Sequence, residues 1–179
     1  GEESFGFMTG DFVRDKDSCG SILTACEIAA WCKANGTTVY EYMIEIYKEV
    51  GFYYEGLINV VRKGRTGAEE ITQMMSDFRS NPPKEIAGSL VEEVKDFKEQ
   101  TCFVVSKNEK KVMDDIPKSN VLIFYTQDGT KVCVRPSGTE PKIKFYVSVK
   151  DSITSKEDFV AKLPKLEEKI AKVKQDLNL

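Results

Sequence analysis

The sequence predicts an α+β fold in which a mainly antiparallel sheet is covered by helices on one face. The first fifty residues are expected to form a loop, over residues 1–16, followed by two helices. After residue 52 the expected order becomes strand, helix, several antiparallel strands and a final helix. A length of 179 residues allows one good core, or one domain together with a piece of another.

Two helices are predicted in the first fifty residues, because each has a recognisable start. Asp17 can cap a helix that runs to about Ala34. Thr38 and Glu41 have the spacing of a capping box, which places the start of a second helix there. Gly51 is expected to stop this second helix.

The pattern changes at residue 52, where aromatic and β-branched residues predict a strand over FYYEGLINVVRKG, residues 52–64. The segment 67–80 then has helical spacing, and Asn81-Pro82-Pro83 ends it. Residues 85–118 are ambiguous, with strand-like pieces at SLVEEV and CFVVS.

Three further strands are predicted over residues 121–126, 131–135 and 143–149, because apolar residues run or alternate there. Asp128-Gly129 is a hairpin signal between the first two of these strands. The last element is a helix beginning at Ser155, in which Pro164 should cause a kink or a restart.

Composition excludes several classes of protein. The net charge of −3 gives no overall attraction to nucleic acid or to anionic membranes, and no apolar run is long enough to span a bilayer. Without histidine, neither Ser-His-Asp nor Cys-His catalysis can be assembled within the chain. The five cysteines form no C-x-x-C pattern, which favours free thiols in a reducing cytoplasm and no metal site.

The segment RPSGTEPK, residues 135–142, joins two predicted strands and is longer than a plain hairpin requires. Arg135 offers a planar fork for phosphate oxygens, Ser137 and Thr139 offer hydroxyls, and Gly138 lets backbone N–H groups turn toward an anion. The alternative is a rigid polar turn whose arginine pairs with a surface carboxylate. For a ligand, the residues favour a phosphate monoester over a polynucleotide.

Two segments resemble one family. RPSGTEPKIKFYV is similar to the phosphate-binding loop in the C-terminal domain of the α-D-phosphohexomutases, the phosphoglucomutase/phosphomannomutase family. GEESFG, followed by DFVRDKD, resembles the sugar-binding loop of the third domain of that family. The resemblance extends over essentially the whole chain and is nearest to the bacterial branch.

The resemblance implies a division of roles. Residues 1–52 would be a helical remnant of the α/β third domain, and residues 53–179 would be the fourth, phosphate-binding domain. Sugar contacts are implied for Glu2, Ser4 and Lys16. Contacts with the phosphate that is not transferred are implied for Arg135, Ser137, Gly138 and Thr139.

The family reaction moves a phosphoryl group between the 1- and 6-positions of a hexose. By resemblance, a phosphoserine in the first domain and Mg²⁺ in the second carry this chemistry, and neither motif is present here. This chain is therefore expected to hold no catalytic residue and no metal ligand, and to be inactive by itself. Its implied partners are glucose or mannose 1- or 6-phosphate and the upstream domains, with no nucleic acid and no membrane.

Two alternatives stay open from the residues. One is a free-standing module that binds sugar phosphate, or another anion, without catalysis. The other is an α+β interaction domain that binds no small ligand. A substitution of Arg135 would separate them, because only the first loses ligand binding with it.

Overall fold

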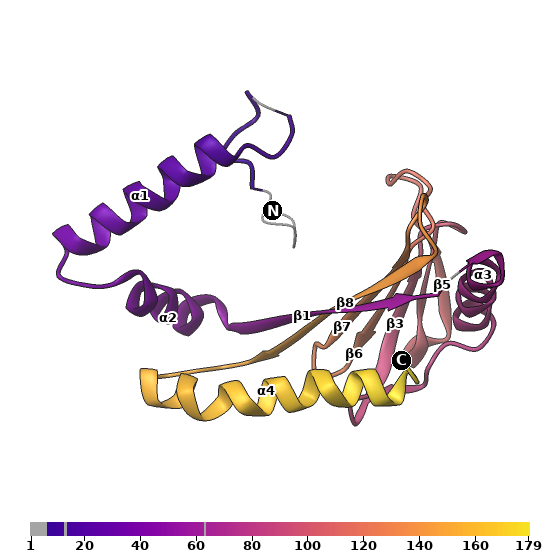
Figure 1. Ribbon diagram of the computed structural model, residues 1–179. Helices are drawn as coiled ribbons and strands as arrows, with labels where there is room; N and C mark the ends of the chain where they lie inside the picture. The colour runs from indigo at the N-terminus through magenta and orange to yellow at the C-terminus, as the bar shows by residue number, and fades with distance from the viewer. Residues whose placement is uncertain (1–6, 13, 63) are drawn as a thin grey trace. The chain divides into compact units, whose positions relative to one another are not determined.

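The computed structural model describes residues 7–12, 14–62 and 64–179, and the chain divides into two compact units. One unit comprises Gly1–Phe52 and Ser152–Phe159, and the other comprises Tyr53–Asp151 and Val160–Leu179. Figure 1 labels the elements along the chain. In order, they are α1 (Ser18–Ala34), α2 (Val39–Val50), β1 (Phe52–Val61), α3 (Gly64–Ser80), β2 (Glu85–Ile86), β3 (Ser89–Asp96), β4 (Thr101–Val104), the short 3₁₀ helix η1 (Val105–Lys107), β5 (Glu109–Val112), β6 (Leu122–Thr126), β7 (Lys131–Pro136), β8 (Lys142–Asp151) and α4 (Lys156–Asp176).

The two helices of the first unit begin where the sequence predicts. The Asp17 carboxylate accepts hydrogen bonds from the backbone N–H groups of Cys19 and Gly20 at 3.0 Å each, so it caps α1. Thr38 and Glu41 form a complete capping box at the start of α2. Both predicted starts are confirmed.

An aromatic cluster holds the first unit together. The Phe159 ring centroid lies 4.8 Å from that of Phe52 and 6.1 Å from that of Tyr47. Tyr40 approaches the same phenylalanine edge-on at 5.9 Å. Offset and edge-to-face contacts of this kind add to the hydrophobic gain of burying the rings. The cluster therefore ties α2 to the first turn of α4.

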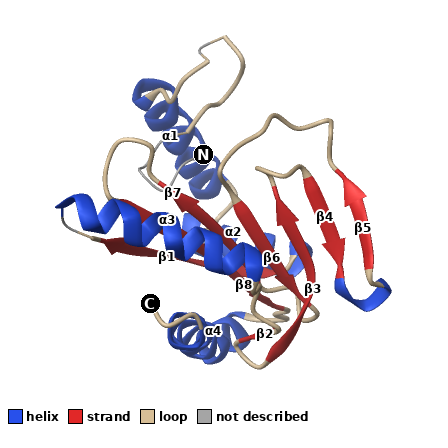
Figure 2. Cartoon of the chain, turned by 90° about the vertical axis from the view of Figure 1, so that its right-hand side faces the viewer, coloured by secondary structure: helices blue, strands red, loops and turns tan. Residues whose placement is uncertain are grey.

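The second unit contains a sheet with the strand order β1-β8-β7-β6-β3-β4-β5, and β2 pairs with β3 (Figure 2). Every strand pairing for which the register is defined is antiparallel. The α+β class is confirmed. The hairpin between β6 and β7 is also confirmed, and Gly129 adopts a φ of +81° in its turn.

The ambiguous residues 85–118 form four of the strands, β2 to β5. Burial explains why the sequence left them unresolved. All four residues of β5 are exposed, and only Val91 of β3 is fully buried. A strand with two solvated faces lacks the apolar alternation from which strands are recognised. These strands are defined instead by pairing with β3, β4 and β6.

The helices of the second unit cover one face of the sheet, as predicted. The Phe78 ring of α3 lies 6.0 Å from that of Phe124 and 5.9 Å from that of Phe145. On the same face, Gly56 of β1 approaches Ile170 of α4 so closely that an added Cβ would lie 2.9 Å from its Cδ1. The buried apolar residues of β6, β7 and β8 lie on this face, so the core is between the sheet and these helices.

The last helix differs from its prediction. Lys156–Asp176 is a single α-helix that contains Pro164, so the helix does not restart there. Proline removes the N–H group that would bond to the carbonyl of Val160, and Val160 is exposed, so water can satisfy that carbonyl. None of the helices in the described part of the chain is long and apolar enough to cross a membrane.

Candidate functional site

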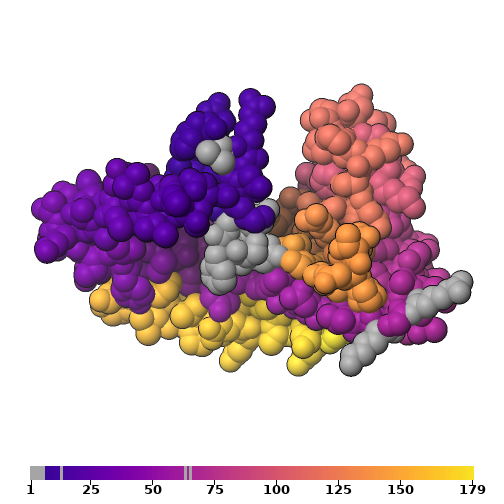
Figure 3. Space-filling view, turned by 45° about the horizontal axis from the view of Figure 1, so that its top comes forward, coloured from indigo at the N-terminus to yellow at the C-terminus, as the bar shows by residue number. Residues whose placement is uncertain are grey.

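The candidate site is the loop between β7 and β8, which lies at the surface of the second unit and is orange in Figure 3. The register of the two strands positions it. Val134 pairs with Phe145, and both side chains are fully buried beneath the helices. The next pair along, Arg135 and Lys144, therefore projects from the opposite, helix-free face. Two cationic side chains thus lie side by side where the loop begins.

Hydrogen bonds within the loop hold it as a compact turn. The Ser137 N–H group donates to the Lys142 carbonyl at 2.8 Å, which closes the loop. The Ser137 hydroxyl accepts longer bonds from the N–H groups of Thr139 and Glu140, at 3.4 and 3.3 Å. Gly138 has a φ outside the left-handed range, and nothing lies within 4 Å of an added Cβ. A left-handed glycine nest is therefore not formed in this conformation.

The electrostatics of the loop leave Arg135 available. Glu140 forms an ion pair with Lys142, and this hydrogen bond holds the pKa of the Glu140 carboxyl below its usual value. The Lys144 ammonium lies 5.9 Å from the centre of the Tyr146 ring. Among the described residues, the exposed Arg135 guanidinium makes no ion pair or hydrogen bond. Its fork can therefore meet an anion from solvent.

These side chains surround a cavity of about 370 Å³, which we call the Arg135 cavity. The structure brings together all four residues of the predicted phosphate site at its wall. The wall consists of Arg135, Pro136, Ser137, Gly138, Thr139, Glu140, Lys142, Lys144 and Tyr146. Three cations and one carboxylate give the cavity a net positive character, and three hydroxyl-bearing residues and an exposed backbone add donors. The arrangement suits a small, highly charged anion.

The groups near the cavity are suited to binding and include no activated nucleophile. Cys133 lies two residues before Arg135 on the same strand, and burial raises the pKa of its thiol. The thiol is therefore protonated near neutral pH and unreactive. All five cysteines are free. In the described part of the chain, no group of three or more Cys, Asp or Glu residues could hold a metal ion.

The residues implied for the sugar are placed less completely. Glu2 and Ser4 lie outside the described residues. Lys16 belongs to the first unit, where its side chain is exposed and its Nζ lies 4.0 Å from the Asp15 carboxylate. Arg135 and its loop belong to the second unit. Within the second unit, the structure brings together the four residues implied for the phosphate, Arg135, Ser137, Gly138 and Thr139.

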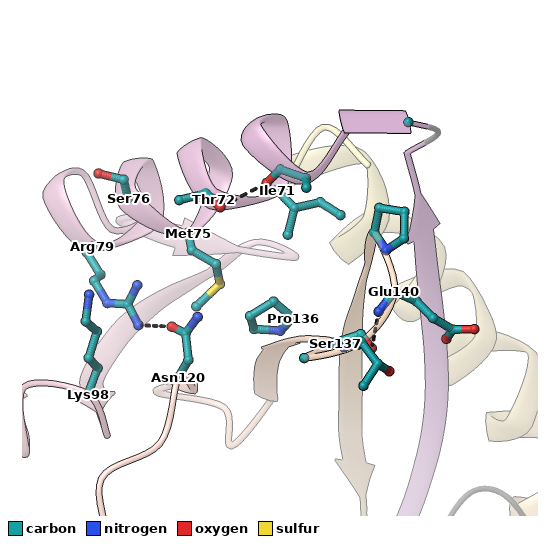
Figure 4. A pocket seen from close by; sticks show the side chains of 15 residues that line it. Ile71, Thr72, Met75, Ser76, Arg79, Lys98, Asn120, Pro136, Ser137 and Glu140 are labelled. Carbon is teal, nitrogen blue, oxygen red and sulfur yellow. Dashed lines mark hydrogen bonds between the residues drawn. The ribbon is translucent and has the colours of Figure 1, made fainter. Parts of the chain in front are cut away.

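A second cavity, which the sequence did not indicate, lies behind the same loop (Figure 4). We call it the Arg79 cavity. Its volume is about 590 Å³, and α3 forms one wall. Arg79, Lys98 and Asn120 group at one end. These three residues come from a helix, a β-turn and a loop, so no local sequence pattern could have linked them.

Comparisons with known proteins give a consistent result. Residues 57–163 match the family model described as phosphoglucomutase/phosphomannomutase, C-terminal domain. A phosphoglucomutase of Staphylococcus aureus strain MRSA252 is 38% identical over 149 residues, which cover 83% of this chain and 27% of that protein. The enzyme of strain N315 is 37% identical over the same length. The chain thus spans about a quarter of these relatives.

One solved structure is also similar. It is the open form of pp63/parafusin, a phosphoglucomutase from Paramecium. The superposition covers 97% of this chain and 30% of that chain, with a TM-score of 0.49 and 19% sequence identity.

Proposed function

The chain belongs to the phosphoglucomutase/phosphomannomutase family, and we propose that it is the substrate-recognising C-terminal part of a hexose-phosphate isomerase. The parent enzyme would move a phosphoryl group between the 1- and 6-positions of glucose or mannose. The match of residues 57–163 to the C-terminal domain of the family supports this role. The matched segment covers 27% of the length of the Staphylococcus aureus relative. We therefore assign the catalytic phosphoserine and the metal site of the parent enzyme to upstream domains.

The Arg135 cavity is the observation that carries the proposal. Its open guanidinium, with Lys144 beside it, supplies charge-assisted donors for two phosphate oxygens. The Ser137 hydroxyl and the N–H group of Thr139 are held to each other only by a 3.4 Å bond, so both can turn to a ligand at small cost. We assign this cavity to the phosphate that is not transferred during the reaction.

Residues 1–52 are proposed to belong to the third domain of the parent. Three large apolar side chains of α1 are exposed: Ile22 by 64%, Leu23 by 62% and Trp31 by 50%. A helix that is apolar on several faces is normally buried in a larger core. This supports residues 1–52 as the helical part of a domain whose sheet lies elsewhere in the parent. From the resemblance of their segment alone, Glu2, Ser4 and Lys16 are proposed as sugar contacts.

Mg²⁺ is proposed for the parent enzyme and not for this chain. When bound in such enzymes, the ion neutralises charge on the transferring phosphoryl group. The acidic metal loop that the resemblance implies is not found in this sequence, so we give this chain no part in holding the ion. Its own residues bind and orient the substrate through the distal phosphate, which places the reacting end by proximity.

A titration of the ¹⁵N-labelled 179-residue chain with glucose 6-phosphate tests the proposal. Amide shifts should concentrate in residues 135–146, with a Kd of about millimolar because half of a closed cleft is missing. Arg135→Met should weaken binding at least about tenfold, since a charge-assisted hydrogen bond contributes roughly 1.5–3 kcal/mol. Lys131→Met is the control, because it removes the same charge from the same strand outside the cavity.

Inorganic phosphate separates the proposed function from a general anion site. Glucose 6-phosphate should bind more tightly than inorganic phosphate, because Tyr146 offers the sugar an aromatic surface. If both bind equally, the loop recognises phosphate without recognising a sugar. If Arg135→Met and Lys131→Met behave alike, the assignment of the cavity is wrong.

A further inference from the structure

The Arg79 cavity is separate from the site proposed for the substrate phosphate. Residues 136–140 form part of both walls, so the loop acts as a partition. Arg135, Lys142 and Lys144 line only the Arg135 cavity, whereas Arg79, Lys98 and Asn120 line only the other. With about 590 Å³, the Arg79 cavity falls within the range of small-molecule sites.

One end of this cavity is cationic and firmly built. The Arg79 Nε donates to the Asp96 carboxylate at 3.0 Å, and an Nη donates to the Asn120 side-chain oxygen at 2.6 Å. Asp96 also accepts the backbone N–H of Lys98 at 2.9 Å. Arg79 and Asp96 are mostly buried, so the guanidinium is fixed in place. Its five N–H donors exceed these two bonds, which leaves donors for a ligand.

Lys98 adds a charge that the protein does not neutralise. Its backbone is anchored to Asp96, and its side chain extends alongside Arg79 (Figure 4). Among the described residues, the Lys98 ammonium forms no ion pair. Since Asp96 balances Arg79, this end of the cavity has a net charge of about one positive unit.

Beyond the cationic end, the part of the α3 wall formed by Ile71 and Met75 is apolar. Ile71 and Met75 project from α3 into the cavity, and Pro136 faces them from the loop (Figure 4). Both α3 side chains are buried core residues, so they form a fixed wall rather than a mobile surface. The hydroxyls of Thr72 and Ser76 lie at the rim. A fitting ligand therefore needs an apolar body and one anionic end.

We propose that the Arg79 cavity is a binding site for a small organic anion with an apolar body, of the carboxylate class. The carboxylate meets Arg79 and Lys98, and the apolar body lies against Ile71 and Met75. Hexose phosphates should bind less well here, because a sugar hydroxyl that faces Ile71 and Met75 would lose water without gaining a hydrogen-bond partner. The inference goes beyond the proposed function and does not depend on it.

Cyclohexanecarboxylate is the probe, with cyclohexylmethanol as its neutral analogue, in a titration of the ¹⁵N-labelled chain. The carboxylate should give saturable shifts at Thr72, Ser76, Lys98 and Asn120, and the alcohol should give much weaker ones. Saturable shifts confined to residues 135–146, no saturable shift at all, or equal binding of the alcohol would each overturn the proposal.

Two pairs of variants locate the ligand. Lys98→Glu should weaken cyclohexanecarboxylate binding about fivefold or more, since it replaces attraction by repulsion. Lys107→Glu makes an equal charge change outside the cavity and should leave the binding unchanged. Thr72→Trp should obstruct the cavity, and Gln73→Trp on the outer side of the same helix should not.

Arg135→Met separates this proposal from the proposed function. It should leave the cyclohexanecarboxylate shifts intact while weakening glucose 6-phosphate binding at least about tenfold. Loss of cyclohexanecarboxylate binding in Arg135→Met, with Lys98→Glu binding normally, would place the carboxylate in the Arg135 cavity and overturn the second site.

Discussion

Replacing Asp128 by alanine should destabilise the sheet that carries the candidate loop between β7 and β8. Asp128 lies in the turn between β6 and β7, and one carboxylate oxygen accepts three hydrogen bonds. Its donors are the Thr126 hydroxyl at 2.7 Å, the Thr130 hydroxyl at 2.8 Å and the Thr130 N–H at 3.0 Å. The other oxygen accepts from the Lys169 ammonium of α4 at 2.6 Å.

The magnitude follows from burial. Thr126 is 3% exposed and Thr130 is 0% exposed, so water cannot replace the lost acceptor. The Thr126 hydroxyl keeps an alternative acceptor in the Thr130 carbonyl at 3.3 Å. The Thr130 hydroxyl has no acceptor other than Asp128 in the described part of the chain. One buried hydroxyl left without an acceptor and one lost charge-assisted contact together cost about 3 kcal/mol. Asp128→Asn keeps one acceptor oxygen, so it should cost about 1 kcal/mol.

Amide hydrogen exchange measures this locally, which avoids assuming that both compact units unfold together. The opening free energies at Val134 and Phe145 should fall by about 3 kcal/mol in Asp128→Ala. Asp114→Ala, in an exposed loop, is the matched control and should change them by less than about 0.5 kcal/mol. A change as small as the control in Asp128→Ala would refute the reasoning.

The effect of Asp128→Ala should also depend on pH. Burial raises the pKa of the carboxyl, but the hydrogen bonds from Lys169, Thr126 and Thr130 together hold it well below its usual value. The stabilising contribution is therefore complete above the usual Asp pKa and is lost as pH falls through the lower value in the folded protein. The difference between Asp128→Ala and the unmodified chain should stay constant from neutral pH to about pH 4 and shrink below it.

Two further predictions concern glycines and thiols. An added Cβ at Gly67 would lie 2.6 Å from the Arg62 backbone. Gly67→Ala should therefore lower the free energy of unfolding, measured by heat or urea, by about 1–3 kcal/mol. Gly138→Ala is the control, since its Cβ would lie in open space, and it should cost less than about 0.5 kcal/mol. Equal losses would contradict the packing. Burial and a hydrogen bond to a glutamate raise the pKa of the Cys102 thiol to about 11, whereas Cys26 is exposed. After iodoacetamide treatment at pH 8, mass spectrometry should therefore find Cys26 alkylated well before Cys102. Similar rates at the two thiols would count against this.

The candidate phosphate site could be predicted because its residues are consecutive. Arg135 to Thr139 form one short segment between two strands in which apolar and polar residues alternate. Their chemistry can therefore be recognised without knowledge of distant contacts. The Arg79 cavity could not be predicted in this way. Its cationic end joins residues 79, 98 and 120, which only the folded chain brings together. The long Ser137 bonds and the ion pair of Glu140 also required the structure.

By itself, the sequence determined the features that depend on neighbouring residues. The caps at Asp17 and Thr38, the turn at Asp128 and the alternation of β7 and β8 all follow from local hydrogen bonding and from spacing. Only the tertiary structure decided how the strands are ordered, with β3 pairing with β6 across two intervening strands and β1 joining β8 at the opposite side. Such pairings depend on burying complementary faces from distant parts of the chain. Local periodicity does not indicate which strand will be the partner.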